Sequence, residues 1–284
     1  MRKKNWYRFS KFLISLLPSK SIKQYFYNKL PQAWECMVYS NEEINHFKEN
    51  VLRYPKLYSP DETLDKIINE NLSFSRIGDG EFNLCINEGN VFNQYDEKLS
   101  QKLMDICQTG STDKCLVCLN NYGVKNFTNK WFIYHGVLYL DEIFNTINFK
   151  KDNYGDAYFL FYTVEKSNTL SIERIKSIWD NKKVVFVCND NSEVISDKSN
   201  LFNNVIEREF VYVPARDAFD LYEDILQKIM QFPKEYIVYL ECGALASVLA
   251  YELSLMGYRA LDMGDCYKRI NNFIERNIGE RSCG

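Results

Sequence analysis

The chain has 284 residues, of which 46% are hydrophobic and 26% charged, with a net charge of −3. This apolar content is enough to bury a core, which excludes disorder over most of the length. Charge is unevenly distributed: the first 34 residues hold eight basic side chains and no acidic one, and the remainder carries a net charge of −11. An acidic body argues against a nucleic-acid-binding groove, so no nucleic-acid partner is expected.

The N-terminal segment mixes basic and apolar residues. Its basic side chains are Arg2, Lys3, Lys4, Arg8, Lys11, Lys20, Lys23 and Lys29. The longest apolar run, residues 12–18, is too short to span a bilayer and lacks a cleavage site, so neither secretion nor a membrane anchor is expected. Two hypotheses remain for residues 1–34: an amphipathic helix that contacts an anionic membrane peripherally, or a helix at the edge of the body.

Nine cysteines are scattered singly through apolar surroundings, which is typical of reduced, buried thiols in the cytoplasm. Cys115 and Cys118 have the spacing of a metal-binding pair. However, no second cysteine pair is placed to complete a tetrahedral site, and the only histidines are His46 and His135. We therefore expect both cysteines to lie in the core. We expect the protein in the cytoplasm and, under the membrane-contact hypothesis, at the inner face of the plasma membrane.

From about residue 61, short apolar runs alternate with helical patterns, which is typical of βα units. We expect strands at residues 72–76, 115–119, 157–162, 183–188, 209–213, 236–241 and 259–263. We expect helices at residues 61–71, 95–108, 168–181, 217–231, 244–256 and 266–277. The sequence therefore predicts an α/β fold: a Rossmann-like, mostly parallel sheet with helices on both faces at residues 61–284, preceded by a helical extension at residues 1–60.

The loop after the first predicted strand carries two carboxylates and two glycines, as Gly78-Asp79-Gly80-Glu81. Ligands of open parallel sheets bind beyond the carboxyl ends of the strands. In extended backbone, Asp79 and Glu81 would point the same way and could hold Mg²⁺ or Mn²⁺ against a diphosphate, while the glycines leave room for the ligand. The alternative is a turn whose acids are solvated or cap the next helix.

Several blocks of the sequence, in order, resemble the GT-D family of bacterial glycosyltransferases. They are residues 75–82 (SRIGDGEF), 95–99 (YDEKL), 178–185 (IWDNKKVV), 213–219 (VPARDAF), 243–253 (GALASVLAYEL) and 257–264 (GYRALDMG). Four or more ordered blocks are far more specific than one motif. The resemblance implies a Rossmann-like catalytic domain, a nucleotide-sugar donor, and an Asp-x-Glu motif that serves the metal and the donor, here Asp79 and Glu81.

The expected activity is transfer of a hexose, glucose first among the candidates, from a UDP-sugar to a glycan or glycoprotein acceptor, assisted by Mn²⁺ or Mg²⁺. The sequence departs from the family pattern at residues 189–197 (NDNSEVISD), where an acidic residue with a glycine is usual. This departure favours the alternative, a non-catalytic subunit that binds a nucleotide or glycan within a polysaccharide assembly complex. The oligomeric state is left open.

Other candidate ligand contacts lie at further junctions between strands and helices. Arg216 precedes a predicted helix and could hold a diphosphate, or it could pair with a neighbouring acid. Arg76 lies in an apolar strand and needs an anionic partner, for which Asp79 or Glu81 is available. Gly243 allows phosphate to approach a helix N-terminus, although tight packing explains it equally well. Asp262 and Asp265 are weaker candidates for a base.

Overall fold

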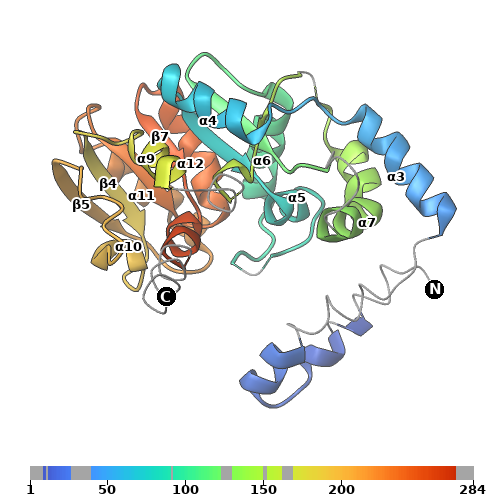
Figure 1. Cartoon of the computed structure of the whole chain (residues 1–284). Helices are drawn as coiled ribbons and strands as arrows, with labels where there is room; N and C mark the ends of the chain where they lie inside the picture. Colours follow the sequence, from blue (N-terminus) through green and yellow to red (C-terminus); the bar gives the residue numbers. More distant parts are fainter. Residues whose placement is uncertain are drawn as a thin grey trace, which may run out of the picture. The chain divides into compact units, whose positions relative to one another are not determined.

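The computed structural model describes residues 9–10, 12–26, 40–90, 92–122, 130–149, 152–161 and 169–272 (Figure 1). The chain packs as two compact units, one comprising Met1–Tyr54 and Tyr122–Phe144 and the other Pro55–Asn121 and Asn145–Gly284. The division suggested by the sequence, an extension that ends at residue 60 ahead of a catalytic domain, stays a proposal.

The second unit is built on a seven-stranded sheet in the order β3-β2-β1-β7-β6-β4-β5. Every neighbouring pair of strands is parallel. The strands are β1 Ser73–Ile77, β2 Cys115–Leu119, β3 Gly155–Asp156, β4 Lys183–Cys188, β5 Glu207–Tyr212, β6 Ile237–Glu241 and β7 Arg259–Asp262. Strand β2 is apolar throughout, and β4 and β6 are apolar except for one terminal residue each, because both of their faces are covered. The predicted α/β fold with a parallel sheet is therefore confirmed.

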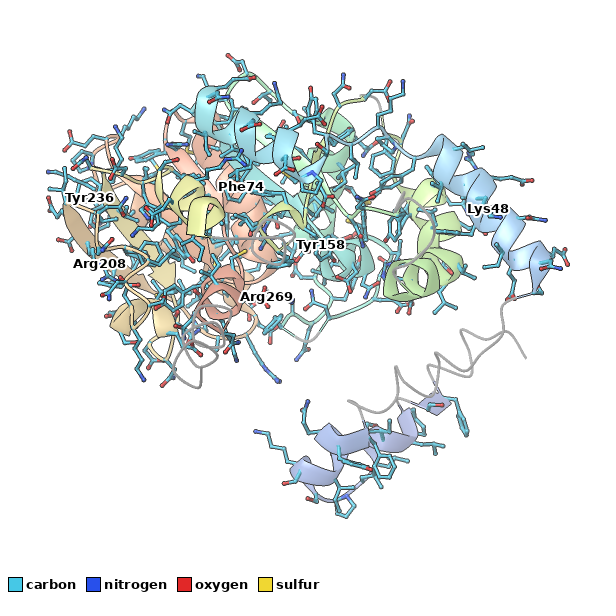
Figure 2. All side chains as sticks on the ribbon, in the orientation of Figure 1. Lys48, Phe74, Tyr158, Arg208, Tyr236 and Arg269 are labelled. Atoms are coloured by element: carbon cyan, nitrogen blue, oxygen red, sulfur yellow. The ribbon has the colours of Figure 1, made fainter. Side chains whose placement is uncertain are left out.

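Helices cover the two faces of this sheet. They are α4 Pro60–Asn69, α5 Asp79–Cys85, α6 Glu97–Thr109, α9 Thr169–Lys176, α10 Glu193–Ser196, η2 Ala218–Leu221, α11 Tyr222–Ile229 and α12 Ala244–Leu255. One core holds Leu64 of α4 and Ile175 of α9, and the other holds Ile225 of α11 and Leu249 of α12. The side chains fill both layers densely (Figure 2).

Helix α12 lies against β1 and β7, and ten of its 12 residues are buried. A helix that is apolar all round is stable only inside a core, and the small residues Ala244, Ala246 and Ala250 allow it to approach the sheet closely. Because α12 follows β6 directly, its N-terminus lies at the carboxyl edge of the sheet. This edge is where a ligand is expected to bind.

The first unit pairs α3 (Asn41–Arg53) with α7 (Lys130–Thr146). A Cβ added to Gly136 would lie 2.3 Å from the Phe47 ring, so this glycine lets the ring reach the α7 backbone. The Asp141 carboxylate accepts hydrogen bonds from Asn50 and from His46, at 2.6 Å and 2.8 Å. These contacts join the two helices. No helix was predicted at α7 from the sequence.

One predicted strand is wrong. Residues 157–162 were expected to form a strand, but β3 ends at Asp156, a turn follows, and a helix begins at Phe159. The Asp156 carboxylate causes the turn, because it accepts a hydrogen bond from the backbone N–H of Tyr158 at 2.8 Å. Tyr162 lies outside the described residues. The last predicted helix begins at Cys266 as expected, and residues 273–277 also lie outside them.

Gly155 fixes how closely β3 packs, which gives a first prediction. A Cβ at this position would lie 2.5 Å from Cys118 Sγ and 3.0 Å from Thr63 Cγ2, although the backbone torsion is open to any residue. Gly155→Ala should therefore overpack the layer and lower the free energy of unfolding by about 1–3 kcal/mol. Urea denaturation followed by circular dichroism measures this change. An unchanged midpoint would show that the layer has room for the methyl group.

Candidate active site

The candidate site lies at the carboxyl edge of β1, β7 and β6, in the middle of the sheet. The chain runs outward from β1 through β2 to β3, and then crosses to β4 and β5 on the other side of the sheet. Such a reversal opens a crevice between loops that leave in opposite directions. Here the loops after the central strands begin at Gly78, Cys242 and Met263.

Asp79 and Glu81 lie in the first turn of α5, with Gly78 as its N-cap. The expectation that both acids extend in the same direction from extended backbone is wrong, because the backbone is helical. The Tyr158 hydroxyl donates to Asp79 Oδ1 at 2.9 Å, whereas Glu81 Oε2 accepts from the Gly78 N–H at 2.9 Å. Glu81 thus caps its own helix, as the alternative hypothesis held, and Asp79 faces the turn that follows β3.

Both glycines make room for neighbouring side chains. A Cβ at Gly78 would lie 3.1 Å from Glu81 Oε2 and 3.6 Å from the Tyr158 hydroxyl. A Cβ at Gly80 would lie 3.2 Å from Asn90 Nδ2, which donates to the Gly80 carbonyl. These close approaches explain the glycines, and neither position needs a positive φ.

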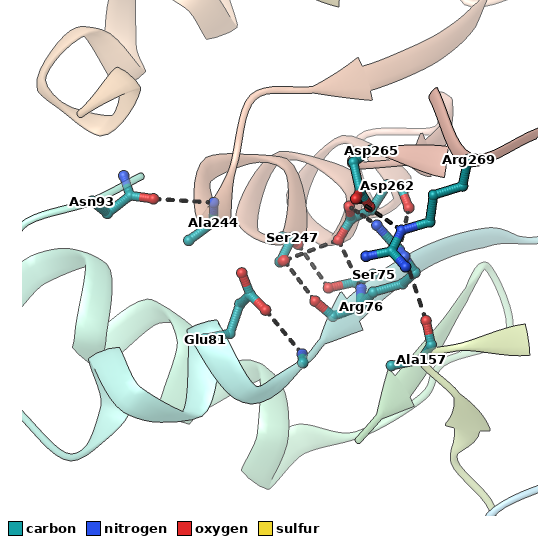
Figure 3. A network of polar contacts seen from close by, with 11 residues as sticks. Ser75, Arg76, Glu81, Asn93, Ala157, Ala244, Ser247, Asp262, Asp265 and Arg269 are labelled. Atoms are coloured by element: carbon teal, nitrogen blue, oxygen red, sulfur yellow. Dashed lines mark hydrogen bonds and ion pairs between the residues drawn. The ribbon is translucent and has the colours of Figure 1, made fainter. Parts of the chain in front are cut away.

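Arg76 is held by Asp262 of β7 and not by Asp79 or Glu81, contrary to the sequence expectation (Figure 3). Its backbone N–H donates to Asp262 Oδ2 at 2.8 Å, its Nε donates to the Asp262 carbonyl at 2.7 Å, and its Nη2 lies 3.6 Å from Asp262 Oδ1. The Ser247 hydroxyl lies 2.9 Å from Asp262 Oδ2 and 2.8 Å from the Arg76 carbonyl. Gly264 borders this guanidinium: a Cβ there would lie 2.2 Å from Arg76 Nη2.

This arrangement separates the roles of the acids at the end of β7. Asp262 is 3% exposed and bonded to Arg76 and Ser247, so it is a structural partner and not an accessible base. Asp265 is half exposed and accepts from Arg269 Nε at 2.8 Å. The Arg269 guanidinium in turn lies 4.1 Å from the centre of the Phe161 ring. Of the two candidate bases, only Asp265 is open to an acceptor.

The pKa of Glu81 is strongly shifted from its ordinary value. Burial, helped by the negative charges of Asp262 and Asp79, raises the pKa of Glu81 to about 7. Figure 3 shows its carboxylate pointing from α5 toward the first turn of α12. Buried carboxylates with raised pKa values gather at functional sites, because a bound cation or a reacting group repays the cost of burying their charge.

The N-terminus of α12 is bordered by the loop that follows α5. Gly243 has φ +64°, a conformation that side chains rarely adopt, and a Cβ there would lie 3.1 Å from Asn93 Oδ1. Asn93 is buried, and its Oδ1 lies 3.4 Å from the Ala244 N–H. The need for glycine is therefore both conformational and steric. The N-terminus of α12 lies at the carboxyl edge of the sheet, where its dipole favours an anion.

Arg216 reaches this region although β5 is at the edge of the sheet. The loop after β5 meets the loop after α5, since the Asp217 N–H donates to the Phe92 carbonyl at 3.0 Å and the Gln94 N–H donates to Asp217 Oδ1 at 2.7 Å. Asp217 is therefore occupied by backbone. The Arg216 side chain is exposed and has no ion pair among the described residues, which leaves it able to bind a ligand.

The residues present fit a divalent cation that is shared with a phosphate group. One oxygen of each motif carboxylate is held by the protein, and the second can coordinate. Within the described residues, no group of three or more His, Cys, Asp or Glu side chains converges as a metal site. Mg²⁺ and related ions often bind one or two carboxylates together with substrate phosphates, and Asp79 and Glu81 would be the residues to supply that donor set. Cys115 and Cys118 are buried in β2, as expected for core thiols.

Sequence reasoning missed two contributors, Tyr158 and Asn93. Tyr158 was assigned to the interior of a strand, and only its position beside Asp156, a residue that favours turns, could have indicated otherwise. Asn93 contacts Ala244 of α12, 151 residues away in the sequence, and no local sequence pattern predicts such a contact. Glu241 is a further acid at this edge: it accepts from Ser192, and burial raises its pKa to about 7.

Comparison with known proteins gives consistent matches. A family model described as a glycosyltransferase of the GT-D fold matches residues 74–279. Glycosyltransferase GlyD of Streptococcus pneumoniae is 28% identical over 216 residues, 72% of this chain and 26% of that protein. The probable glycosyl transferase Gly of Streptococcus gordonii is 25% identical over 247 residues, 81% of this chain and 34% of that protein. The chain thus spans only about a quarter to a third of the length of these relatives.

Solved structures share the fold. One, described as a new glycosyltransferase from Streptococcus sanguinis, aligns with a TM-score of 0.68 and 23% identity over 79% of this chain and 86% of that one. Another, described as a domain of unknown function with a distinct glycosyltransferase fold, aligns with a TM-score of 0.71 and 24% identity over 83% of this chain and 86% of the other.

The raised pKa of Glu81 predicts a specific pH dependence of stability. Because this pKa is about 7 against an ordinary 4.5, the folded protein binds the proton more tightly than the unfolded chain does. Protonated Glu81 therefore stabilises the fold fully below pH 4.5, the ordinary pKa. This stabilisation is lost as the pH rises through about 7, the pKa in the folded protein, because folding must then bury a charge.

Glu81→Gln keeps an acceptor for Gly78 and removes this charge. The difference in the free energy of unfolding, variant minus wild type, should therefore increase by about 1–3 kcal/mol between pH 4.5 and pH 8. Urea titrations with chelator and without nucleotide give both values. If the two proteins show parallel pH profiles, the carboxylate is not buried as described.

Proposed function

Since the chain belongs to the GT-D fold family of glycosyltransferases, we propose that it transfers a hexose, glucose in the first instance, from a UDP-sugar to an acceptor hydroxyl. The acceptor is a glycan or a glycosylated protein of bacterial surface assembly. Mn²⁺ or Mg²⁺ assists the transfer. The observation that carries the proposal is the position of Asp79 and Glu81 at the start of α5, where Glu81 points toward the first turn of α12.

Electrostatics explains why a cation is part of this proposal. Asp79, Glu81, Asp262 and Asp265 gather near the ends of β1 and β7, and Arg76 is already paired with Asp262. An anionic diphosphate would be repelled by these carboxylates unless a positive charge lies between them. Asp79 and Glu81 would hold Mn²⁺ or Mg²⁺, which would supply that charge and could stabilise a departing diphosphate.

The other groups bind and orient the donor. The N-terminus of α12 can attract phosphate oxygens through its dipole and its N–H groups. The exposed Arg216 can add a bidentate contact to the diphosphate from the loop that contacts residues 92–94. The acceptor then approaches from the side of Asp265, the half-exposed acid at the end of β7.

The second candidate function is a non-catalytic subunit that binds a nucleotide or glycan. The observation that favours it is the polar segment 189–197, which lacks the family's usual glycine and places Ser192 against Glu241. A subunit of this kind would bind UDP-sugar without turning it over. The presence of both Asp79 and Glu81 makes the catalytic proposal the stronger one.

Binding of the donor should depend on the motif and on metal together. We expect calorimetry to show UDP binding in the presence of Mn²⁺, and Asp79→Asn and Glu81→Gln should each weaken it at least about tenfold, the lower end for groups that tune a metal site. Glu173→Gln, an exposed acid-to-amide change on α9, serves as the matched control and should bind like the wild type.

Release of free UDP from UDP-glucose then separates the two candidate functions. UDP release that requires Mn²⁺ supports the transferase. Binding of UDP-glucose without UDP release, whichever acceptor is added, supports the non-catalytic subunit. UDP binding that ignores chelator and both motif substitutions would overturn the proposed donor site.

We also propose that residues 1–34 bind the protein to an anionic membrane surface. In the described part of this segment most of the large apolar side chains are exposed, among them Phe12 at 56% and Leu16 at 63%, whereas Ile14 is buried. Lys20 and Lys23 follow on the next helical stretch, and the whole segment holds no acid. None of the described helices has the length and apolar character needed to cross a bilayer. A peripheral contact combines apolar insertion with attraction to anionic lipids.

Vesicle flotation tests this contact. The protein should float with phosphatidylglycerol vesicles and not with phosphatidylcholine vesicles. Lys20→Gln with Lys23→Gln should weaken the association about thirtyfold, because each lysine near an anionic surface contributes about 1 kcal/mol. Lys56→Gln with Lys114→Gln, two exposed lysines of the second unit, is the control. Equal loss in both double variants would show that overall charge, and not this segment, is responsible.

A further inference from the structure

The hydroxyl of Tyr158 donates to Asp79 Oδ1 at 2.9 Å. It also lies 3.6 Å from the position that a Cβ on Gly78 would take, so it rests directly over the loop that carries the motif. Tyr158 is partly exposed, and its side chain is labelled in Figure 2. It comes from the turn after β3, two strands away from β1 in the sheet. One side chain thus connects that turn to the motif carboxylate.

Asp156 holds this turn in place. Its carboxylate is fully buried and accepts from the Tyr158 N–H and from Asn121 Nδ2, each at 2.8 Å. Its own N–H donates to the Thr63 hydroxyl at 3.0 Å, which ties the turn to α4. The Tyr158 ring packs on Phe161 with 5.7 Å between ring centres. The phenol is therefore fixed by groups that have no other role at the site.

A phenol that donates to a carboxylate has a definite chemical effect. It occupies one oxygen, which fixes the rotation of the carboxylate and leaves the other oxygen to coordinate a cation. Without this donor, Asp79, at the first position of a short helix, could rotate toward solvent or toward the free N–H groups of its own helix. Glu81 needs no such donor, because the Gly78 N–H already holds one of its oxygens.

We propose that Tyr158 is a positioning residue that orients Asp79 for the metal and the donor diphosphate. The inference rests on the proposed function, since it names how one ligand of that same site is held. Tyr158 acts through Asp79 and does not touch the reacting atoms. Tyr158→Phe should keep the ring on Phe161 and remove only the hydroxyl.

The test compares Tyr158→Phe with the wild type in calorimetric titrations of Mn²⁺, alone and with saturating UDP. We expect the apparent Mn²⁺ affinity to fall about 10–100-fold, the usual cost of removing a group that orients a metal ligand. The rate of UDP release from UDP-glucose at low Mn²⁺ should fall with it and recover at high Mn²⁺. A merely structural hydroxyl would not produce recovery by metal.

Tyr258→Phe is the matched control. The Tyr258 hydroxyl donates to the Phe232 carbonyl at 3.1 Å beside the start of β7, at the opposite edge of the sheet, so its loss should leave Mn²⁺ affinity unchanged. Thermal unfolding of both variants reports whether the fold is intact. A Tyr158→Phe protein that binds Mn²⁺ like the wild type overturns the positioning role alone. A wild type that binds neither Mn²⁺ nor UDP overturns the proposed function, and the positioning role with it.

Discussion

The buried contact between Arg76 and Asp262 organises the centre of this fold. It joins the end of β1 to the end of β7, and Ser247 adds α12 to the same network. Burying an arginine and an aspartate is costly, and breaking such a pair by removing one partner costs about 3–5 kcal/mol because the other charge is left unpaired. The pair therefore fixes the relative position of three elements whose ends build the candidate site. It also takes Arg76 and Asp262 out of direct chemistry.

The division of roles among the remaining acids follows from this constraint. With Asp262 committed to Arg76, the negative charge near the site belongs to Asp79, Glu81 and Asp265. Burial and the neighbouring negative charges raise the pKa of Glu81, although the hydrogen bond from the Gly78 N–H opposes this shift, and Asp79 is oriented by Tyr158. Each motif carboxylate is held by a neutral donor through one oxygen. The second oxygen of each carboxylate would then be left to coordinate a divalent cation.

Much of the fold could be predicted from the sequence, because the strands at 115–119 and 183–188 are continuous apolar runs that only a doubly covered sheet explains. The motif at Asp79 and Glu81 could also be found, since it follows the first strand. Its geometry could not: Gly78 as N-cap turns the backbone helical at once, and spacing alone does not distinguish this from extended backbone. The turn after Asp156 was not predicted for a similar reason: the apolar residues at 159–161 have a composition that is typical of a strand. The contacts of Asn93 with α12 and of Asp262 with Arg76 span 151 and 186 residues and depend on topology alone.

The central claim is that Asp79 and Glu81 hold a divalent cation against the diphosphate of a nucleotide sugar at the start of α12. Anomalous diffraction at the manganese edge, from crystals grown with Mn²⁺ and UDP, tests it most directly. The account predicts one strong peak within coordination distance of both motif carboxylates, with the diphosphate between that peak and the N-terminus of α12. A peak elsewhere, or UDP bound at this edge with no manganese beside the motif, would contradict it.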